Sequence, residues 1–362
     1  MRRLGRPGIE AAVRLDLLRS LGVRSAWSRR KDEARVADRA ARGARPGYER
    51  IWTEAGAQVG ADATVLGGGF FELRAGARRA RVWNHWVPLD DAVTLRLALD
   101  KPLVRNLLRE EGLPVTDQLE YETGDLSPAV AFLDERAGPC VVKPADASGG
   151  SGTTSGIVSL GDLRRASLRA SRLSRRLLVE KQLEGDVYRL LFLDGELIDV
   201  VRRVAPHVVG DGRSTIAELV SVENARRADA AATEVTPLLR LDLDAVFTLR
   251  NLGLKAGSVP AAGVSVPVKR AVSQNSARDN DSVLAEVTDD FAAEAARAVA
   301  AVGLRLAGVD VIAPSHRTAP SQSGGAILEV NGTPGLHYHY AISNPESGVP
   351  VAAVILRKLL AP

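Results

Sequence analysis

Alternating apolar and polar residues predict two β-hairpins in this chain. One covers residues 64–83, with Gly76 near its turn. The other covers residues 188–204, where Asp194 and Gly195 form a dipeptide typical of a two-residue hairpin turn. Short apolar runs bounded by turn-forming residues predict further strands at residues 141–142, 177–186, 266–272, 308–313 and 326–335.

Apolar residues at helical spacing predict helices between and around these strands. Residues 53–60 are too few to assign, and Gly112 and Pro114 end one helix in the usual way. The predicted helices cover residues 8–42, 94–111, 160–176, 215–229, 289–306 and 349–360.

Mixed strands and helices indicate an α/β (α+β) protein of more than one domain. The first 90 residues or so read as a small α/β domain that packs against the rest. Residues 205–268 are less regular, because Pro237, Pro260 and Pro267 interrupt their periodicity. We expect substrate-specific structure there, since long irregular segments tend to carry binding.

Composition places the chain among globular proteins. Its 362 residues suffice for two or three domains, with 45% hydrophobic and 25% charged residues. No run approaches the roughly 20 apolar residues that span a bilayer, and no apolar signal core follows Met1, so we expect no membrane partner and a cytoplasmic location. Cys140 is the only cysteine, which excludes an internal disulfide and disfavours a thiolate metal site.

Charge is unevenly distributed along the chain. Residues 1–50 hold 14 Lys and Arg against 6 Asp and Glu, whereas the whole chain has a net charge of only +4. Nucleic acid is one explanation, but the usual aromatic residues and recognition modules are missing, so an exposed arginine-rich helix is favoured. Lysine is scarce, which draws attention to Lys101, Lys143 and Lys181.

The segment from Val141 to Thr154, V-V-K-P-A-D-A-S-G-G-S-G-T-T, predicts a polyphosphate site. Its glycines reach positive φ without strain and let an anion approach the backbone N–H groups. The lysine precedes the glycines and a strand follows them, so this is not a Walker A loop but a hairpin laid over phosphates. A glycine-rich surface turn is the competing interpretation.

Oxygen-bearing side chains near the C-terminus predict a magnesium site. Glu329 and Asn331 are two apart on a predicted strand and share a face, and antiparallel pairing would bring Asp310 beside them. With phosphate oxygens and water, such ligands complete the octahedral shell of Mg²⁺. The competing interpretation is a strand that ends in an Asn331-Gly332 turn.

Other polar side chains among apolar ones are further candidates. Arg189, Arg202 and Arg203 lie on predicted strands, where an arginine either reaches the surface or meets an anion. His85 could be a catalytic base, although a hydrogen-bonded structural histidine is the favoured interpretation.

Several motifs together resemble the ATP-grasp ligases, most closely the ATP-grasp portion of cyanophycin synthetases. The resemblance covers residues from about 95 to the C-terminus. It rests on these stretches, in family order: K-P-L-V-R-N-L-L, V-V-K-P-A-D-A-S-G-G-S-G, V-E-K-Q-L-E-G-D-V-Y-R-L, R-R-V-A-P-H-V-V-G-D-G-R-S-T-I-A-E-L, G-V-D-V-I-A and L-E-V-N-G-T-P-G-L-H-Y-H.

The resemblance implies an ATP-grasp fold of two α+β subdomains clasping ATP. The expected units are an N-terminal domain at 1–92, a lid subdomain at 93–180 and a large subdomain at 181–362. ATP and Mg²⁺ are the implied cofactors, with two ions expected and Mn²⁺ as an alternative ion. The implied chemistry is attack of a carboxylate on the γ-phosphate of ATP, after which an amine displaces phosphate from the acyl phosphate.

The resemblance also implies residue roles. It implies that Mg²⁺ is bound by Asp310, Glu329 and Asn331. It also implies that the transferring phosphoryl group or the acid substrate is contacted by Arg189, Arg203 and Arg270. ATP contacts fall to Lys101, Lys143, Ser148, Gly149, Gly150, Ser151, Gly152, Glu180, Lys181, Leu183 and Asp186. Three places depart from the family pattern. Val187 stands where an acidic ribose ligand is common, His337 stands where arginine is, and S-Q-N-S-A-R-D-N around Asn275 replaces a Ser/Thr-Gly-Gly.

Several functions stay open at this stage. The second half of cyanophycin synthetases is absent, so a stand-alone amino-acid or peptide ligase acting on small acids and amines is expected, with a homodimer compatible. A ligase that macrocyclises a ribosomal precursor peptide is the enzymatic alternative, and a catalytically silent nucleotide-binding module is another. All ligase hypotheses require Lys143 and the Asp310, Glu329 and Asn331 side chains to face one nucleotide.

Overall fold

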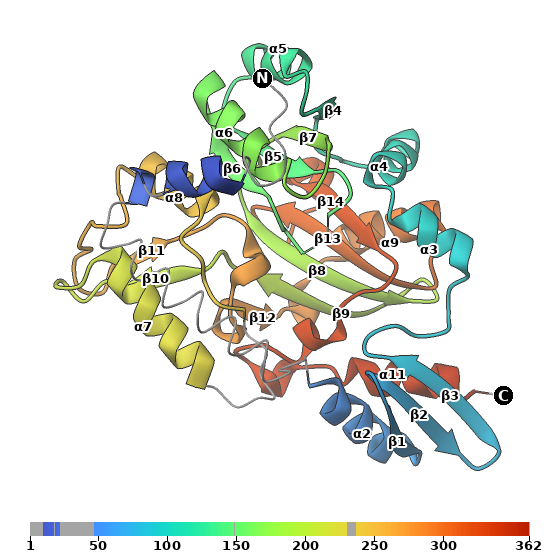
Figure 1. The fold of residues 1–362 in the computed structure, drawn as a ribbon. Coiled ribbons are helices and arrows are strands. Elements are labelled where there is room, and N and C mark those ends of the chain that lie inside the picture. The colour runs from blue at the N-terminus through green and yellow to red at the C-terminus, as the bar shows by residue number, and fades with distance from the viewer. Residues whose placement is uncertain (1–9, 18, 22–46, 148, 230–236, 362) are drawn as a thin grey trace.

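A computed structural model describes residues 10–17, 19–21, 47–147, 149–229 and 237–361 of the chain. Four antiparallel sheets occur in this part of the molecule, and the smallest has only two strands. Figure 1 shows a five-stranded sheet across the middle, a four-stranded sheet above it, and a three-stranded sheet at the lower right. The predicted helix at 8–42 lies partly, and Ser148 wholly, outside the described residues.

The five-stranded sheet has the order β12-β9-β8-β13-β14. Asp194 and Gly195 join two of its strands with φ of 50° and 85°, the left-handed pair that a tight hairpin turn requires, so this predicted hairpin is confirmed. Residues of β8, β13, β14, α4 and α9 share its core. The bounds are β8 (Asp186–Leu193), β9 (Glu196–Arg203), β12 (Asn280–Ser282), β13 (Leu306–Ala313), β14 (Ala326–Asn331) and α9 (Asp289–Val302).

The four-stranded sheet has the order β4-β7-β5-β6. A second core lies against it and extends to residues 205–268 and to Val13, Leu17 and Leu21 of the N-terminal helical segment. The bounds are β4 (Gln118–Glu122), β5 (Cys140–Pro144), β6 (Thr154–Ile157), β7 (Arg176–Lys181), α5 (Ser127–Glu135), α6 (Leu160–Ala170), α7 (Ile216–Asp229), α8 (Leu243–Asn251), β10 (His207–Val209) and β11 (Ser265–Pro267).

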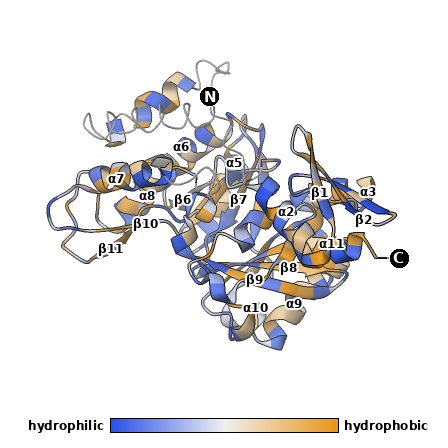
Figure 2. Ribbon diagram, turned by 90° about the horizontal axis from the view of Figure 1, so that it is seen from below, coloured by the Kyte–Doolittle hydropathy of each residue, from blue (hydrophilic) through white to orange (hydrophobic). Residues whose placement is uncertain are grey.

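The three-stranded sheet combines with the two ends of the chain. Its strands β1 (Asp62–Gly67), β2 (Phe70–Ala75) and β3 (Arg78–Trp83) share a core with α2 (Tyr48–Val59) and α11 (Val351–Leu359). Figure 2 shows apolar residues gathered along β8, β9 and α11, where this core meets the five-stranded sheet. The predicted hairpin at 64–83 therefore has a third strand, and residues 53–60 are helical.

Two predicted helices are shorter than expected. Residues 94–111 form α3 (Ala92–Ala98) and α4 (Lys101–Glu110), because Pro102 lacks an N–H and Asp100 caps a new helix by accepting a bond from Leu103 N. The helix expected at 160–176 ends at Ala170, and Arg176 already begins β7. The remaining elements are α10 (Pro320–Ser323) and the 3₁₀ turns η1 (Val272–Gln274), η2 (Ala277–Asp279), η3 (Leu284–Glu286), η4 (Leu336–His339) and η5 (Pro345–Ser347).

No helix among the described residues is both long and apolar enough to cross a bilayer. The predicted division at residues 92 and 180 stays a prediction.

Candidate nucleotide and acid site

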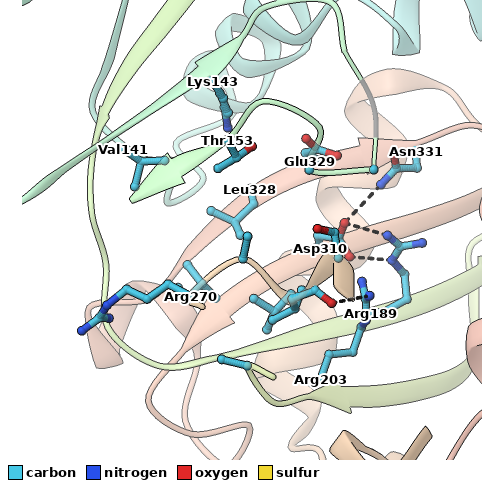
Figure 3. Close-up of a pocket in the computed structure, with 18 of the residues that line it drawn as sticks. Val141, Lys143, Thr153, Arg189, Arg203, Arg270, Asp310, Leu328, Glu329 and Asn331 are labelled. Atoms are coloured by element: carbon cyan, nitrogen blue, oxygen red, sulfur yellow. Dashed lines mark hydrogen bonds and ion pairs between the residues drawn. The ribbon is translucent and has the colours of Figure 1, made fainter. Parts of the chain in front are cut away.

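A cavity of about 430 Å³ lies between the four-stranded and five-stranded sheets. Lys143 lies on its upper wall and Asp310, Glu329 and Asn331 lie across from it (Figure 3). The juxtaposition that the ligase hypotheses require is therefore present.

Strand register sets the acidic wall of the cavity. Asp310 on β13 pairs with Glu329 on β14, and Asn331 lies two residues further along β14 on the same face. The Asn331 amide donates to Asp310 Oδ2 at 3.4 Å and to the Gly308 carbonyl at 3.3 Å. The three oxygen-bearing side chains thus project together from one face of two neighbouring strands.

Arg189 balances the charge of Asp310. Its Nε donates to Asp310 Oδ1 at 2.5 Å and its Nη2 to Asp310 Oδ2 at 2.7 Å, a bidentate pair in which both side chains are buried. Burial alone would raise the pKa of Asp310, but the Arg189 charge outweighs burial and holds this pKa below its usual value. A Cβ at Gly308 would lie 3.3 Å from Arg189 Cδ, so a glycine there leaves room for the arginine.

Lys143 and Lys101 are also paired with carboxylates. Lys143 Nζ lies 2.8 Å from Glu180 Oε2 across neighbouring strands β5 and β7. Burial lowers the pKa of Lys143, but Glu180 and Glu329 outweigh it and raise this pKa overall. Lys101, at the start of α4, donates to Glu329 Oε1 at 2.7 Å and to the Ala147 carbonyl at 2.8 Å, and so links β14 to the loop before the glycines.

The glycine loop borders the cavity, and we call residues 149–154 the flap. Gly149 and Gly150 have φ of 63° and 66° and line the cavity with Thr153. A Cβ at Gly150 would lie 2.8 Å from Ser273 Oγ, so the flap backbone closely approaches residues 270–273, which line the opposite side.

Arg203 is the buried arginine of this site that forms no ion pair with a carboxylate in the part of the chain that the structure describes. Its side chain is 4% exposed, its Nη2 donates to the Val272 carbonyl at 3.2 Å, and its buried Nε finds no acceptor among the described residues. Its guanidinium lies 4.3 Å from the centre of the Tyr338 ring, a cation–π contact. Burial lowers the pKa of Arg203 and the nearby Arg189 charge adds to this effect, while Tyr338 and Asp310 offset it only in part.

Aromatic and imidazole rings form the far end of the cavity. The His337 and Tyr338 ring centres are 4.1 Å apart, and Tyr48 of α2 bonds to His337 Nδ1 at 2.7 Å. Burial raises the pKa of Tyr48, which therefore keeps its proton beside His337. Burial also lowers the pKa of His85, whose ring lies 5.7 Å from that of Tyr48. The N-terminal segment thus contributes to the cavity.

A pH dependence of stability follows from His337. Burial, with smaller effects of His85 and the arginines, lowers its pKa to about 3, whereas an unfolded histidine titrates near 6.5. Below pH 6.5 this histidine is protonated in the unfolded chain but stays neutral in the folded chain. The free energy of unfolding is therefore highest above pH 6.5 and falls by up to about 1.4 kcal/mol per pH unit towards pH 3. Denaturant unfolding of wild type and His337→Gln at pH 7.5 and 5.0 should show a smaller loss in the variant. An equal loss in both would contradict the assignment.

Most of the predicted site residues line the cavity. These are Lys143, Gly149, Gly150, Glu180, Lys181, Leu183, Arg189, Arg203, Arg270, Asp310, Glu329 and Asn331. Arg270 lies near the mouth, where it donates to the exposed Glu184 at 2.7 Å. Lys101 reaches the cavity only through Glu329, and Ser151 and Gly152 lie in the flap without lining the cavity.

Asp186 does not line the cavity, whereas Val187 does. Alternation along β8 puts Val187 and Arg189 on the cavity face and Asp186 on the other face with Tyr188. The role of Asp186 as an ATP contact stays a prediction that this geometry does not favour.

Some lining residues were missed by the sequence prediction. Tyr338 follows His337 inside a quoted motif, and its aromatic ring beside candidate arginines was an available signal. Val272 and Ser273 belong to an irregular segment and gave no local signal. Tyr48 lies 289 residues from His337 in sequence, so only the tertiary fold brings the two together.

Hard divalent cations such as Mg²⁺ prefer oxygen ligands, which carboxylates, amide groups and water supply. No group of three or more His, Cys, Asp and Glu side chains within the described ranges is placed to hold a metal ion. Two carboxylates and an amide oxygen are a sparse set, but a hard one that phosphate oxygens and water can complete for Mg²⁺. The residues therefore fit an ion that arrives with a polyphosphate.

No family model matches the chain. It is 32% identical over 274 residues to a cyanophycin synthetase of Trichormus variabilis, a match that covers 73% of this chain and 29% of that protein. It is 29% identical over 375 residues to a cyanophycin synthetase of Synechocystis, with 98% of this chain and 41% of that protein covered. The chain spans less than half the length of these curated relatives.

A solved structure shows a similar fold. The crystal structure of a bifunctional glutathione synthetase from Pasteurella multocida matches with a TM-score of 0.56 and 23% sequence identity. The match covers 86% of this chain and 44% of that chain.

Proposed function

Because the chain is an ATP-grasp protein related to the cyanophycin synthetases, we propose that it is a Mg²⁺-dependent ligase that uses ATP to join a carboxylate to an amine through an acyl phosphate. The ATP-grasp fold expected from the sequence is confirmed. The observation that carries the proposal is that Lys143, the flap glycines, Asp310 and Glu329 share one cavity.

The nucleotide would lie between the flap and the edge of β7. Lys143 and the backbone N–H groups of Gly149 and Gly150 would contact its phosphates, and Lys101 would support Glu329 from behind. The backbone after β7, from Lys181 to Leu183, would meet the adenine, and the apolar side chains of Val141 and Leu183 suit a flat base.

Asp310, Glu329 and Asn331 would hold Mg²⁺ through their oxygens. When bound, the ion would neutralise phosphate charge during phosphoryl transfer. Arg189 fixes the orientation of Asp310 by two hydrogen bonds and would keep the carboxylate ionised and aimed into the cavity.

Arg203 would bind the carboxylate of the acid substrate. Asp310 already neutralises Arg189 and Glu184 already pairs with Arg270, so Arg203 is the cavity arginine without an ion pair among the described residues. A substrate carboxylate would supply the missing counterion and acceptor at once. The same charge would then stabilise negative charge that develops as the carboxylate attacks the γ-phosphate.

Coupled measurement of ADP release tests the proposed function. Pairs of standard amino acids and short peptides are supplied with ATP and Mg²⁺, and products are identified by mass spectrometry. We expect ADP and phosphate in equal amounts with an amide product that forms only when acid and amine are both present. Dependence on a long precursor peptide would point to the macrocyclising alternative, and tight ATP binding without ADP formation in the presence of any pair would contradict the ligase.

A further inference from the structure

We propose that Asp244 is a positioning residue that couples the nucleotide flap to Arg203, so that nucleotide binding orders the acid-binding side of the cavity. The inference rests on the proposed function and adds a link between its two substrates. Asp244 lies in the first turn of α8 and its side chain is fully buried.

The two carboxylate oxygens of Asp244 reach the two sides of the cavity. Oδ1 accepts a hydrogen bond from Ser155 N at 2.8 Å, at the point where the chain leaves the flap and enters β6. Oδ2 accepts one from Ala271 N at 3.3 Å. Ser155 and Ala271 both line the cavity, so one buried side chain spans the flap and the segment 270–273.

The path continues from Ala271 to the acid site. The next residue, Val272, offers its carbonyl to Arg203 Nη2 at 3.2 Å. From the other direction, the backbone of Gly150 in the flap approaches Ser273 closely. A shift of the flap therefore bears on residues 271–273 by direct contact and through Asp244, and these residues hold Arg203.

The chemistry of Asp244 suits this link better than that of a neutral side chain. Two backbone N–H groups that approach from different sides need two acceptor oxygens, which a carboxylate has and an amide lacks. A buried carboxylate is costly unless hydrogen bonds and nearby cations compensate it. Burial lowers the pKa of the nearby Arg169, but the charges of Asp242 and, less strongly, of Asp244 outweigh burial and raise it.

Helix α8 is anchored firmly enough to transmit such a shift. Asp242, its N-cap, pairs with Arg169 at 2.6 Å and with Lys269 at 2.9 Å. Arg250, near its other end, pairs with Asp162 at 2.6 Å and donates to the Gly156 carbonyl at 3.2 Å. The helix therefore holds α6, β6 and the segment that leads to Arg270 in one unit.

Hydrogen exchange followed by mass spectrometry tests the coupling without any acid or amine. The full chain is compared with and without Mg²⁺ and a non-hydrolysable ATP analogue. In wild type we expect exchange to slow in peptides covering 149–155 and, about 5-fold or more, in peptides covering 269–275. In Asp244→Asn we expect the flap to remain protected and most of the 269–275 protection to be lost, because only the close approach of Gly150 to Ser273 then joins the two segments.

Two further variants keep the test decisive. Asp199→Asn replaces another fully buried carboxylate, one that accepts a bond from Ser282 Oγ at 3.1 Å and lines no part of the cavity, and should behave as wild type. Ala271→Pro removes the other partner of the link where φ is already −67°, and should reproduce the loss even where Asp244→Asn fails to fold.

The possible results separate the coupling from the proposed function. If peptides covering 269–275 kept the wild-type level of protection in Asp244→Asn or in Ala271→Pro, the coupling would be overturned. Wild-type protection confined to the flap would also overturn it, while nucleotide binding would stand. Wild type that shows no protection at saturating analogue would instead count against the proposed function itself.

Discussion

Replacement of Glu329 by glutamine is expected to reduce ligation about 10²–10³-fold, the usual cost of losing one preorganised charge contact. Glu329 faces Asp310 across the β13–β14 pair and binds Lys101, so the substitution removes a negative charge where Mg²⁺ is proposed to bind. Its side chain is 28% exposed, and glutamine can still accept a bond from Lys101, so the melting temperature should change little.

Turnover and Mg²⁺-dependent binding of a fluorescent ATP analogue should be measured together on this variant. We expect the Mg²⁺ concentration for half-maximal nucleotide binding to rise as turnover falls. Glu120→Gln is a matched control, because Glu120 pairs with Arg176 at 2.7 Å on the exposed surface and lines no part of the cavity. Wild-type turnover in Glu329→Gln would remove this residue from the mechanism.

Local sequence patterns predicted the parts of the site that depend on strand geometry. Alternation along one strand is enough to put Glu329 and Asn331 on one face, and antiparallel pairing then brings Asp310 opposite Glu329. The Asp194-Gly195 turn was equally local, because only a few residue types adopt positive φ at both positions. The break before Lys101 was also visible as Asp100 and Pro102, although helical spacing across it suggested one helix.

Contacts between distant segments could not be read from the sequence in the same way. Which carboxylate neutralises which cation depends on register and on how the sheets meet, so Arg189, Arg203 and Arg270 looked equivalent. The structure separates them: Arg189 is paired and buried, Arg270 is paired and half-exposed, and Arg203 is buried with no ion pair to any carboxylate that the structure describes. The Tyr48 to His337 bond is a similar case, since no pattern near either residue indicates the other.

Because Arg203 is buried with an unsatisfied Nε, removing its charge should have opposite effects on the stability and on the activity of the protein. A buried cation without a counterion costs folding free energy, and that cost is recovered only when an anion binds beside it. An unfavourable buried charge of this kind is expected at a binding site, where a ligand can offset its cost, but not at a purely structural position. The two effects can be separated by removing the charge while keeping the volume.

Arg203→Met is therefore expected to unfold at a higher temperature than wild type, with a free energy of unfolding about 1–2 kcal/mol larger. Its ligation activity is expected to fall by about 10²-fold or more. Methionine fills the space beside Tyr338 and removes the unsatisfied Nε, at the expense of one bond to Val272 and one cation–π contact. The loss should appear in kcat/KM for the acid, with the Kd of the ATP analogue nearly unchanged. Differential scanning calorimetry and the ADP-release assay measure the two effects on the same samples.

Arg270→Met is the matched control for this experiment, because Arg270 also lines the cavity but keeps an exposed acidic partner. Its removal should change the free energy of unfolding by no more than about 1 kcal/mol, since an exposed ion pair contributes little. If Arg203→Met were destabilised like a broken buried ion pair, an acidic partner would have to lie beside it and the acid site would have to be placed elsewhere. A stabilised variant with full turnover would show instead that the arginine charge has no part in binding the acid.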